Sequence, residues 1–316
     1  MIGNGEIRRQ VAEKIKPNRL KIFGYSLVYG LIISMIASAV GSIFSLVTNI
    51  IGFMVSIPIG MALKLAEDDV SAIANLIGSP FAFVFSIIVG VLVAVFGIGY
   101  LREMLLCTDS SQNISPIDFF KLGLKDYKRT AKVYLRLWLK FIPPAVVCFV
   151  GEGIMAIGLI AIGNEIVQIL LTLTGLLLIL IGGVWSFIIL LLYQTIEYEI
   201  IHDDTSDAKQ LLAKSRETIR GHLWQWTKMN YFYSVIFGLI AFAVAMIFTI
   251  GLIIGTYMIS NAGNGASAIG VLLMIFDVII FIPSCIAISL FLQYFSAKNI
   301  FNKEELYKAI TSESIN

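Results

Sequence analysis

The chain has 316 residues, of which 58% are hydrophobic and only 14% are charged. Soluble domains carry about 25% charged residues, so this composition, with a mean hydropathy of +0.88, excludes an ordinary soluble protein. The net charge of +2 says little as a total, because membrane topology depends on how Lys and Arg are distributed among the loops. We therefore predict an all-α, polytopic transmembrane helical bundle.

The first 21 residues form a basic segment ahead of the first apolar run. Its positive charges are Arg8, Arg9, Lys14, Lys16, Arg19 and Lys21. Because basic residues disfavour translocation across a membrane, we expect residues 1–21 to stay in the cytoplasm, in a helical conformation. The first membrane span is predicted over 25–47.

The apolar composition persists beyond residue 47, and two arrangements are open for the segment that follows. Residues 50–65 could form an additional span, or residues 50–78 could form an external segment that lies in the interface or dips partway into the bilayer. An additional span would place the next polar loop outside, with its basic residues Arg102, Lys121, Lys125, Lys128, Arg129, Lys132, Arg136 and Lys140. Because that arrangement inverts the positive-inside rule, the external segment is preferred.

The second span, predicted over 81–101, is followed by the start signal of a further helix. Ser115, Pro116 and Asp118 supply a cap, a first-turn proline and an acidic residue. The next residues carry positive charges at spacings of four, three, four and four: Lys121, Lys125, Lys128, Lys132 and Arg136. The spacing predicts one amphipathic cytoplasmic helix with a basic stripe before the third span. The stripe either contacts anionic lipid headgroups or is the ordinary positive face of an inner loop.

The rest of the chain contains four more apolar runs that are long enough to cross a bilayer. We predict spans over 141–163, 166–193, 231–258 and 268–295, followed by a cytoplasmic tail over 296–316. With six spans, all of the 23 Lys and Arg residues except Lys64 lie in the cytoplasm or at its boundary. The sequence therefore predicts one domain over 1–316, in a multi-pass membrane protein with both termini cytoplasmic.

The polar stretch between the fourth and fifth spans, residues 194–229, predicts a short cytoplasmic helix. Asp204 or Thr205 is expected to cap its first turn, Asp207 adds negative charge there, and Gly221 supplies a left-handed end. Small and apolar residues recur at three- and four-residue spacing along one face: Ala208, Leu211, Leu212, Ser215 and Ile219. The remaining faces carry Lys209, Lys214, Arg216 and Arg220, so the helix is expected to be amphipathic.

Glu152 and Asp277 are the ionisable residues deepest within apolar runs. A charged residue at the centre of a membrane helix costs about 2.5 to 3.5 kcal/mol, so each carboxyl needs compensation. One hypothesis is a proton or cation relay in the interior of the bundle. The other is a protonated or hydrogen-bonded carboxyl that holds two helices together.

The sequence has no recognisable catalytic motif. H-E-x-x-H, G-x-S-x-G, a Walker loop and a Rossmann fingerprint are all missing. The polar residues Glu197, Glu199, His202, Asp203 and Asp204 lie close in sequence, but an ordinary solvated loop has the same composition. We therefore expect no enzyme, no catalytic residue, no cofactor, no metal site and no nucleic-acid partner.

The order of features from about residue 93 to 295 resembles a family of bacterial six-span membrane proteins, the domain of unknown function numbered nine-seven-five. The matching residues are Gly99, Leu101, Leu105, Asp118, Phe119, Phe120, Tyr193, Asp203, Ala208, Ser215, Gly221, Pro283 and Tyr294. The chain departs from that pattern at Pro143-Pro144 and in the longer segment after the first span. The resemblance implies a six-helix bundle in a bacterial plasma membrane and no particular substrate.

These observations favour a non-enzymatic membrane protein that acts as a scaffold, an accessory subunit or a lipid-contacting component. Membrane lipids are the expected partners, together with a second copy of the chain or another membrane protein. The alternative is a transporter or permease subunit for an ion or a small substrate, which would use Glu152 or Asp277.

Overall fold

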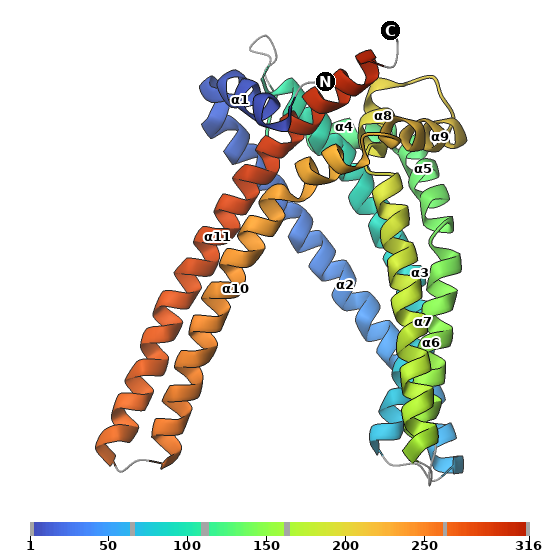
Figure 1. The fold of residues 1–316 in the computed structure, drawn as a ribbon, viewed down its shortest axis with the longest axis vertical. Coiled ribbons are helices and arrows are strands. Elements are labelled where there is room, and N and C mark those ends of the chain that lie inside the picture. Colours follow the sequence, from blue (N-terminus) through green and yellow to red (C-terminus); the bar gives the residue numbers. More distant parts are fainter. Residues whose placement is uncertain (1–2, 64–66, 109–113, 161–164, 262–263, 314–316) are drawn as a thin grey trace. The chain divides into compact units, whose positions relative to one another are not determined.

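The computed structural model describes residues 3–63, 67–108, 114–160, 165–261 and 264–313. At some helical positions within these ranges, Asp277 among them, only the backbone is described. Every secondary-structure element in these ranges is a helix (Figure 1). The prediction of an all-α protein is therefore confirmed.

Several of the helices are long and apolar enough to cross a membrane. Within the described ranges five candidates are Lys16–Pro58, Ile77–Leu106, Glu165–His202, Gly238–Ser260 and Ile269–Ser312. A sixth results if Tyr127–Leu139 and Ile142–Gly158, which meet at a bend of 45°, count as one broken span. The chain is thus a multi-pass membrane protein with five or six candidate spans.

The contacts within the chain divide it into two compact units, described separately below. Unit 1 comprises Met1–Gly30, Cys107–Gln112 and Trp224–Asn316, and unit 2 comprises Leu31–Leu106 and Asn113–Leu223. The sequence predicts one domain, and no change in composition marks these boundaries. The division arises from tertiary packing, which brings the two ends of the chain into one unit.

Unit 1 is built on the pairing of α10 (Leu223–Asn261) with α11 (Asn264–Glu313). The rings of Phe248 and Phe281 stack at 4.1 Å, and a Cβ added at Gly270 would lie 2.8 Å from the carbonyl oxygen of Gly255. These contacts bring the two backbones close together. The helix α11 continues to Glu313, so most of the segment predicted as a tail, 296–316, extends the last helix.

The two ends of the chain meet in unit 1. The helix α1 (Asn4–Lys14) buries Ile7 and Val11, and its Lys14 ammonium lies 2.6 Å from the Glu305 carboxylate near the end of α11. A short 3-10 turn, η1 (Lys16–Asn18), leads from α1 into α2. Figure 1 shows α1 beside the last turns of α11. The first helix is therefore held against the C-terminal part of the last helix.

In unit 2, α2 (Arg19–Leu63) packs against α3 (Glu67–Leu106). The rings of Phe44 and Phe85 stack at 4.3 Å, and a Cβ added at Gly52 would lie 2.5 Å from the Ala74 carbonyl oxygen. The first span was predicted to end at residue 47, but the helix α2 continues through residues 47–50 without a break. The apolar residues after 47 propagate the helix. The predicted external segment 50–78 therefore consists of the last turns of α2, residues 64–66, which lie outside the described ranges, and the first turns of α3.

The helices α6 (Ile142–Ile160) and α7 (Glu165–Leu192) form the second tight pair of unit 2. A Cβ added at Gly151 would lie 2.7 Å from the carbonyl oxygen of Gly175, and a Cβ added at Gly175 would lie 2.5 Å from that of Gly151. Close approach through small residues is how helices associate in lipid, where the hydrophobic effect gives no drive.

The single amphipathic helix predicted after residue 118 is two helices, α4 (Phe119–Lys125) and α5 (Tyr127–Leu139). The break falls at Asp126, whose φ of −121° and ψ of 27° lie outside the helical region. Asp126 pairs at 2.7 Å with Arg102 of α3. Because α4 is also packed backbone to backbone against α3, the chain must change direction before α5 begins.

Candidate functional site

Two short helices follow α7 at the end where α4 and α5 lie (Figure 1). They are α8 (Ile196–His202), which periodicity did not reveal, and α9 (Ala208–Ile219). The cap of α9 is Asp207, which accepts from the backbone of Gln210 while Gln210 accepts from Asp207 N–H in a capping box. The prediction of Asp204 or Thr205 as the cap is therefore wrong. Gly221 has a φ of +89°, which confirms the left-handed end.

The helix α9 buries the residues that share one face: Ala208, Leu211, Leu212, Ser215 and Ile219. Ala208, Leu211 and Leu212 belong to a core formed with α5, α8 and the end of α7. Beside this core, the buried Thr195 Oγ1 lies 3.1 Å from the Ser215 carbonyl oxygen and 2.9 Å from the Ser215 hydroxyl, within hydrogen-bond distance of both. We call α4, α5, α8 and α9 the polar helical cluster.

A lysine joins two carboxylates inside this cluster. Lys214 Nζ lies 3.0 Å from Asp203 and 3.4 Å from Glu199, whose side chain is fully buried. Glu199 also accepts a 2.7 Å hydrogen bond from the Thr218 hydroxyl. Two carboxylates of the polar stretch thus flank one ammonium group. Among the described residues no cluster of His, Cys, Asp and Glu has the arrangement of a metal site.

These contacts shift the acidity of the groups that make them. The Ser206 hydroxyl and the Lys214 ammonium, both hydrogen-bonded to Asp203, hold the pKa of that carboxyl well below its usual value. Burial disfavours the charged form of Lys214, but the hydrogen bond to Asp203 and the charge of Glu199 outweigh it and raise the pKa of Lys214. Both groups are therefore charged at neutral pH.

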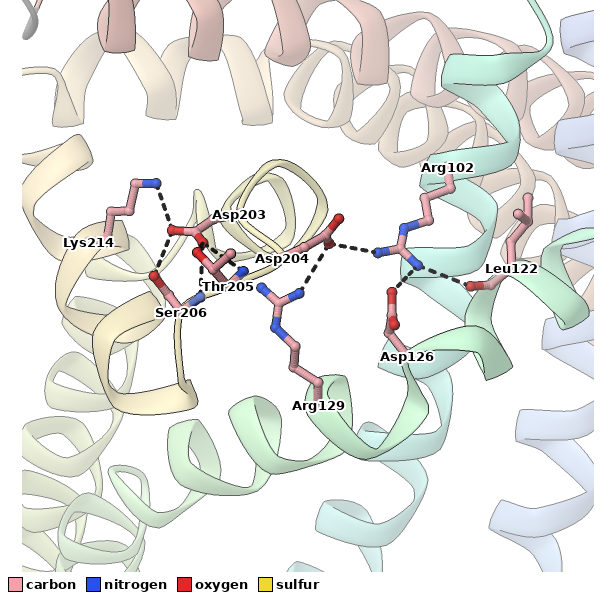
Figure 2. Close-up of polar contacts among 9 residues, drawn as sticks. All are labelled: Arg102, Leu122, Asp126, Arg129, Asp203, Asp204, Thr205, Ser206 and Lys214. Carbon is pink, nitrogen blue, oxygen red and sulfur yellow. Dashed lines mark hydrogen bonds and ion pairs between the residues drawn. The ribbon is translucent and has the colours of Figure 1, made fainter.

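A second ionic network links the loop before α9 to α3 and α5 (Figure 2). Asp204 lies 3.3 Å from Arg129 and 4.0 Å from Arg102, and Arg102 also donates to the carbonyl oxygen of Leu122 at 3.3 Å. Arg102 is largely buried, with 13% of its side chain exposed. Figure 2 shows Arg102 between Asp204 and Asp126, so its positive charge is shared by two carboxylates. This network fixes the cluster to the end of α3.

A cavity of about 1210 Å³ lies between α5, α9 and the end of α7. Its charged lining consists of Arg136, Lys140, Lys209, Arg216, Arg220 and Glu217. Five cations therefore face one carboxylate. Arg136 has a buried Nη1 that meets no hydrogen-bond partner among the described residues, and a buried donor of this kind is costly unless an acceptor reaches it.

The remaining wall of the cavity is apolar. Leu139, Leu192 and Leu212 line it, and Leu192 is the last residue of the apolar helix α7. Farther along α7, Leu180, Val184 and Ile188 are exposed on the helix surface. The cavity therefore combines positive charge with an apolar wall at the point where the apolar helix α7 ends.

The helix break at Asp126 divides the five residues of the predicted basic stripe between α4 and α5. Lys121 is 86% exposed beside Asp118 on α4, while Lys125 lines a smaller cavity with Arg102. Lys128 and Lys132 are exposed on α5, and Arg136 alone lines the large cavity. The sequence analysis did not predict the other cations of the cavity as ligands: Lys140, Lys209, Arg216 and Arg220. The spacing of residues within α5 does not reveal that α9 packs beside it.

Glu152 lies half-buried in α6, beside Gly151, and lines none of the cavities described above. Asp277 lies within α11, but its side chain falls outside what the structure describes. The relay hypothesis for these two carboxyls therefore stays a prediction. No family model matches the chain, and neither the curated proteins nor the solved structures contain a match to it.

Proposed function

We propose that this chain is a non-enzymatic, six-span protein of a bacterial plasma membrane whose polar helical cluster binds anionic lipid headgroups on the cytoplasmic side. The observation that carries the proposal is the exposure of Lys121, Lys128 and Lys132 on α4 and α5, beside the exposed apolar side chains of Leu124 and Leu135. Each basic residue near an anionic membrane surface contributes about 1 kcal/mol of binding free energy. The proposed role is thus a lipid-contacting scaffold or accessory component.

The contact between the two ends of the chain supports six spans rather than five. Lys14 of α1 pairs with Glu305 of α11, so both ends lie on one side of the membrane. A chain whose ends share a side crosses an even number of times. The apolar helix α6, which meets α5 at the bend of 45°, supplies the additional crossing.

Residues that carry the resemblance to the family numbered nine-seven-five lie in contact in unit 2. Gly99 approaches the backbone of Phe119, and the rings of Phe119 and Phe120 stack at 4.2 Å. Asp203, at the end of α8, accepts a hydrogen bond from Lys214 of α9, and Ser215 of α9 is hydrogen-bonded to Thr195 at the start of α8. This supports proposing membership of that family, since these residue types have defined roles in the packing.

The first prediction concerns topology. In a background with Cys107, Cys148 and Cys285 replaced by serine, Lys121→Cys should react with a membrane-impermeant maleimide only after the cell is opened. Glu165→Cys, at the other end of the α6–α7 pair, should react in intact cells. Both positions are exposed, so accessibility is set by the side of the membrane. Labelling of position 121 from outside would overturn the proposed orientation.

The second prediction concerns lipid preference. In nanodiscs with equal phosphatidylglycerol and phosphatidylcholine, the protein should retain mainly phosphatidylglycerol on extraction, as measured by native mass spectrometry. The triple variant Lys121→Gln, Lys128→Gln and Lys132→Gln should weaken this preference about 10- to 100-fold, because three surface charges are lost.

The matched control keeps the charge at the same positions: Lys121→Arg, Lys128→Arg and Lys132→Arg. It should retain the preference, which should also decline as salt rises. Equal retention of the two lipids by the unaltered protein would reject the proposed function.

A further inference from the structure

We infer that the cavity between α5, α9 and the end of α7 is a specific site for one anionic lipid whose headgroup carries two phosphates. The inference rests on the proposed contact with anionic lipids and assigns it a ligand class. It concerns one cavity, whereas the exposed lysines of α4 and α5 act on the membrane surface as a whole.

The charge of the cavity favours more than one phosphate. Two cations come from α5 and its end, Arg136 and Lys140, and three from α9 and its end, Lys209, Arg216 and Arg220. Glu217 is the one carboxylate among the lining residues, which leaves a formal excess of four positive charges. A single phosphodiester carries one negative charge and would leave most of this excess uncompensated.

The types of cation and their placement also fit phosphate. Arginine presents a planar fork of donors that matches the oxygens of a phosphate group. Arg136 lines the cavity from α5, and Arg216 and Arg220 line the same cavity from α9. Cations on two helices can therefore hold two phosphates at separate points.

The apolar wall favours a lipid over a soluble phosphate compound. Leu139, Leu192 and Leu212 would gain nothing from a hydrated diphosphate, but they can contact the first methylenes of acyl chains. Leu192 also ends α7, so the cavity lies where a headgroup meets the apolar part of the span. Basic pockets beside membrane helices are known to hold lipids such as cardiolipin.

The experiment compares cardiolipin with phosphatidylglycerol, matched in acyl chains and total phosphate, on the full-length protein by native mass spectrometry. We expect one cardiolipin to remain bound under conditions that remove phosphatidylglycerol. The double variant Arg216→Gln and Arg220→Gln should lower the affinity for cardiolipin about 30-fold, the equivalent of about 2 kcal/mol for two lost contacts. Both side chains are exposed, so thermal unfolding should stay unchanged.

The matched control, Lys121→Gln with Lys128→Gln, removes the same charge outside the cavity. It should keep the bound cardiolipin while losing part of the general preference for phosphatidylglycerol over phosphatidylcholine. If the cavity variant keeps cardiolipin while the control loses that preference, the inference fails and the proposed function stands. If the unaltered protein shows no preference for phosphatidylglycerol over phosphatidylcholine but the cavity variant loses cardiolipin, the surface function fails and the site stands.

Two further arms identify the ligand. Inorganic pyrophosphate should not displace cardiolipin at equal concentration, and displacement would assign the cavity to a soluble diphosphate instead. Phosphatidylglycerol that binds as tightly as cardiolipin would overturn the requirement for two phosphates.

Discussion

Replacing Gly99 with valine should prevent α4 from packing against α3 and lower the free energy of unfolding by about 3 kcal/mol or more. A Cβ at position 99 would overlap the carbonyl oxygen of Phe119 and lie 2.6 Å from the backbone nitrogen of Gly123. Because the obstacle is backbone and not a flexible side chain, rotamer changes cannot relieve it. Thermal unfolding of the purified protein in detergent measures the effect.

The control for this variant is Gly183→Val in α7. A Cβ at Gly183 meets nothing within 4 Å, so the valine there adds the same atoms to a helix without a packing conflict. It should unfold within a few degrees of the unaltered protein. If Gly99→Val unfolds at the same temperature as Gly183→Val, the close contact between α3 and α4 does not hold the polar helical cluster in place.

The sequence correctly predicts those helical features that depend only on neighbouring residues. The spacing of Ala208, Leu211, Leu212, Ser215 and Ile219 places these residues on one face of α9, and all of them are buried. Gly221 ends that helix in the left-handed conformation, because glycine adopts it without the clash that a Cβ introduces. In both cases the cause lies within a few residues of the effect.

The incorrect predictions concern residues whose conformation depends on partners that are distant in the sequence. The basic spacing runs unbroken across Asp126, yet Asp126 is drawn out of the helix beside Arg102 of α3. Asp204 has the chemistry of a cap, but it pairs with Arg129, and Asp207 caps α9 instead. Local patterns cannot rank these contacts, because the competing partners are distant in the sequence.

The large cavity illustrates the same limit. Arg136 and Arg216 belong to separate helices, and each looks like an ordinary residue on a positively charged face. Their charges converge only because α9 packs on α5 through Leu211 and Val133 of the shared core. The candidate site is therefore a product of tertiary structure, although the sequence indicates the kind of residue it would use.

Replacing Lys214 with methionine should destabilise the polar helical cluster by about 2 kcal/mol at pH 7. Removing one partner of a buried ion pair costs about 3 to 5 kcal/mol, and the value is discounted here because 45% of the Lys214 side chain is exposed. The fully buried Glu199 carboxylate would lose the positive charge that lies 3.4 Å from it. Thermal unfolding in detergent should show the loss.

The choice of pH follows from the direction of the two pKa shifts. The lowered pKa of Asp203 means that its contribution to stability is complete above the unfolded value of about 3.9 and is lost as pH falls through the folded pKa. The raised pKa of Lys214 means that its contribution is complete below about 10.4 and is lost as pH rises through the folded pKa. At pH 7 both contributions are therefore complete.

A second substitution separates the loss of charge pairing from a loss of packing. Glu199→Gln combined with Lys214→Met should recover about 1 kcal/mol relative to Lys214→Met alone, because the buried group is then neutral and its amide oxygen can still accept from the Thr218 hydroxyl. Lys128→Met, at an exposed position on α5, controls for the loss of one positive charge. If Lys214→Met is as stable as Lys128→Met, or if the double variant recovers nothing, the ion pair with Glu199 is not what holds α8 against α9.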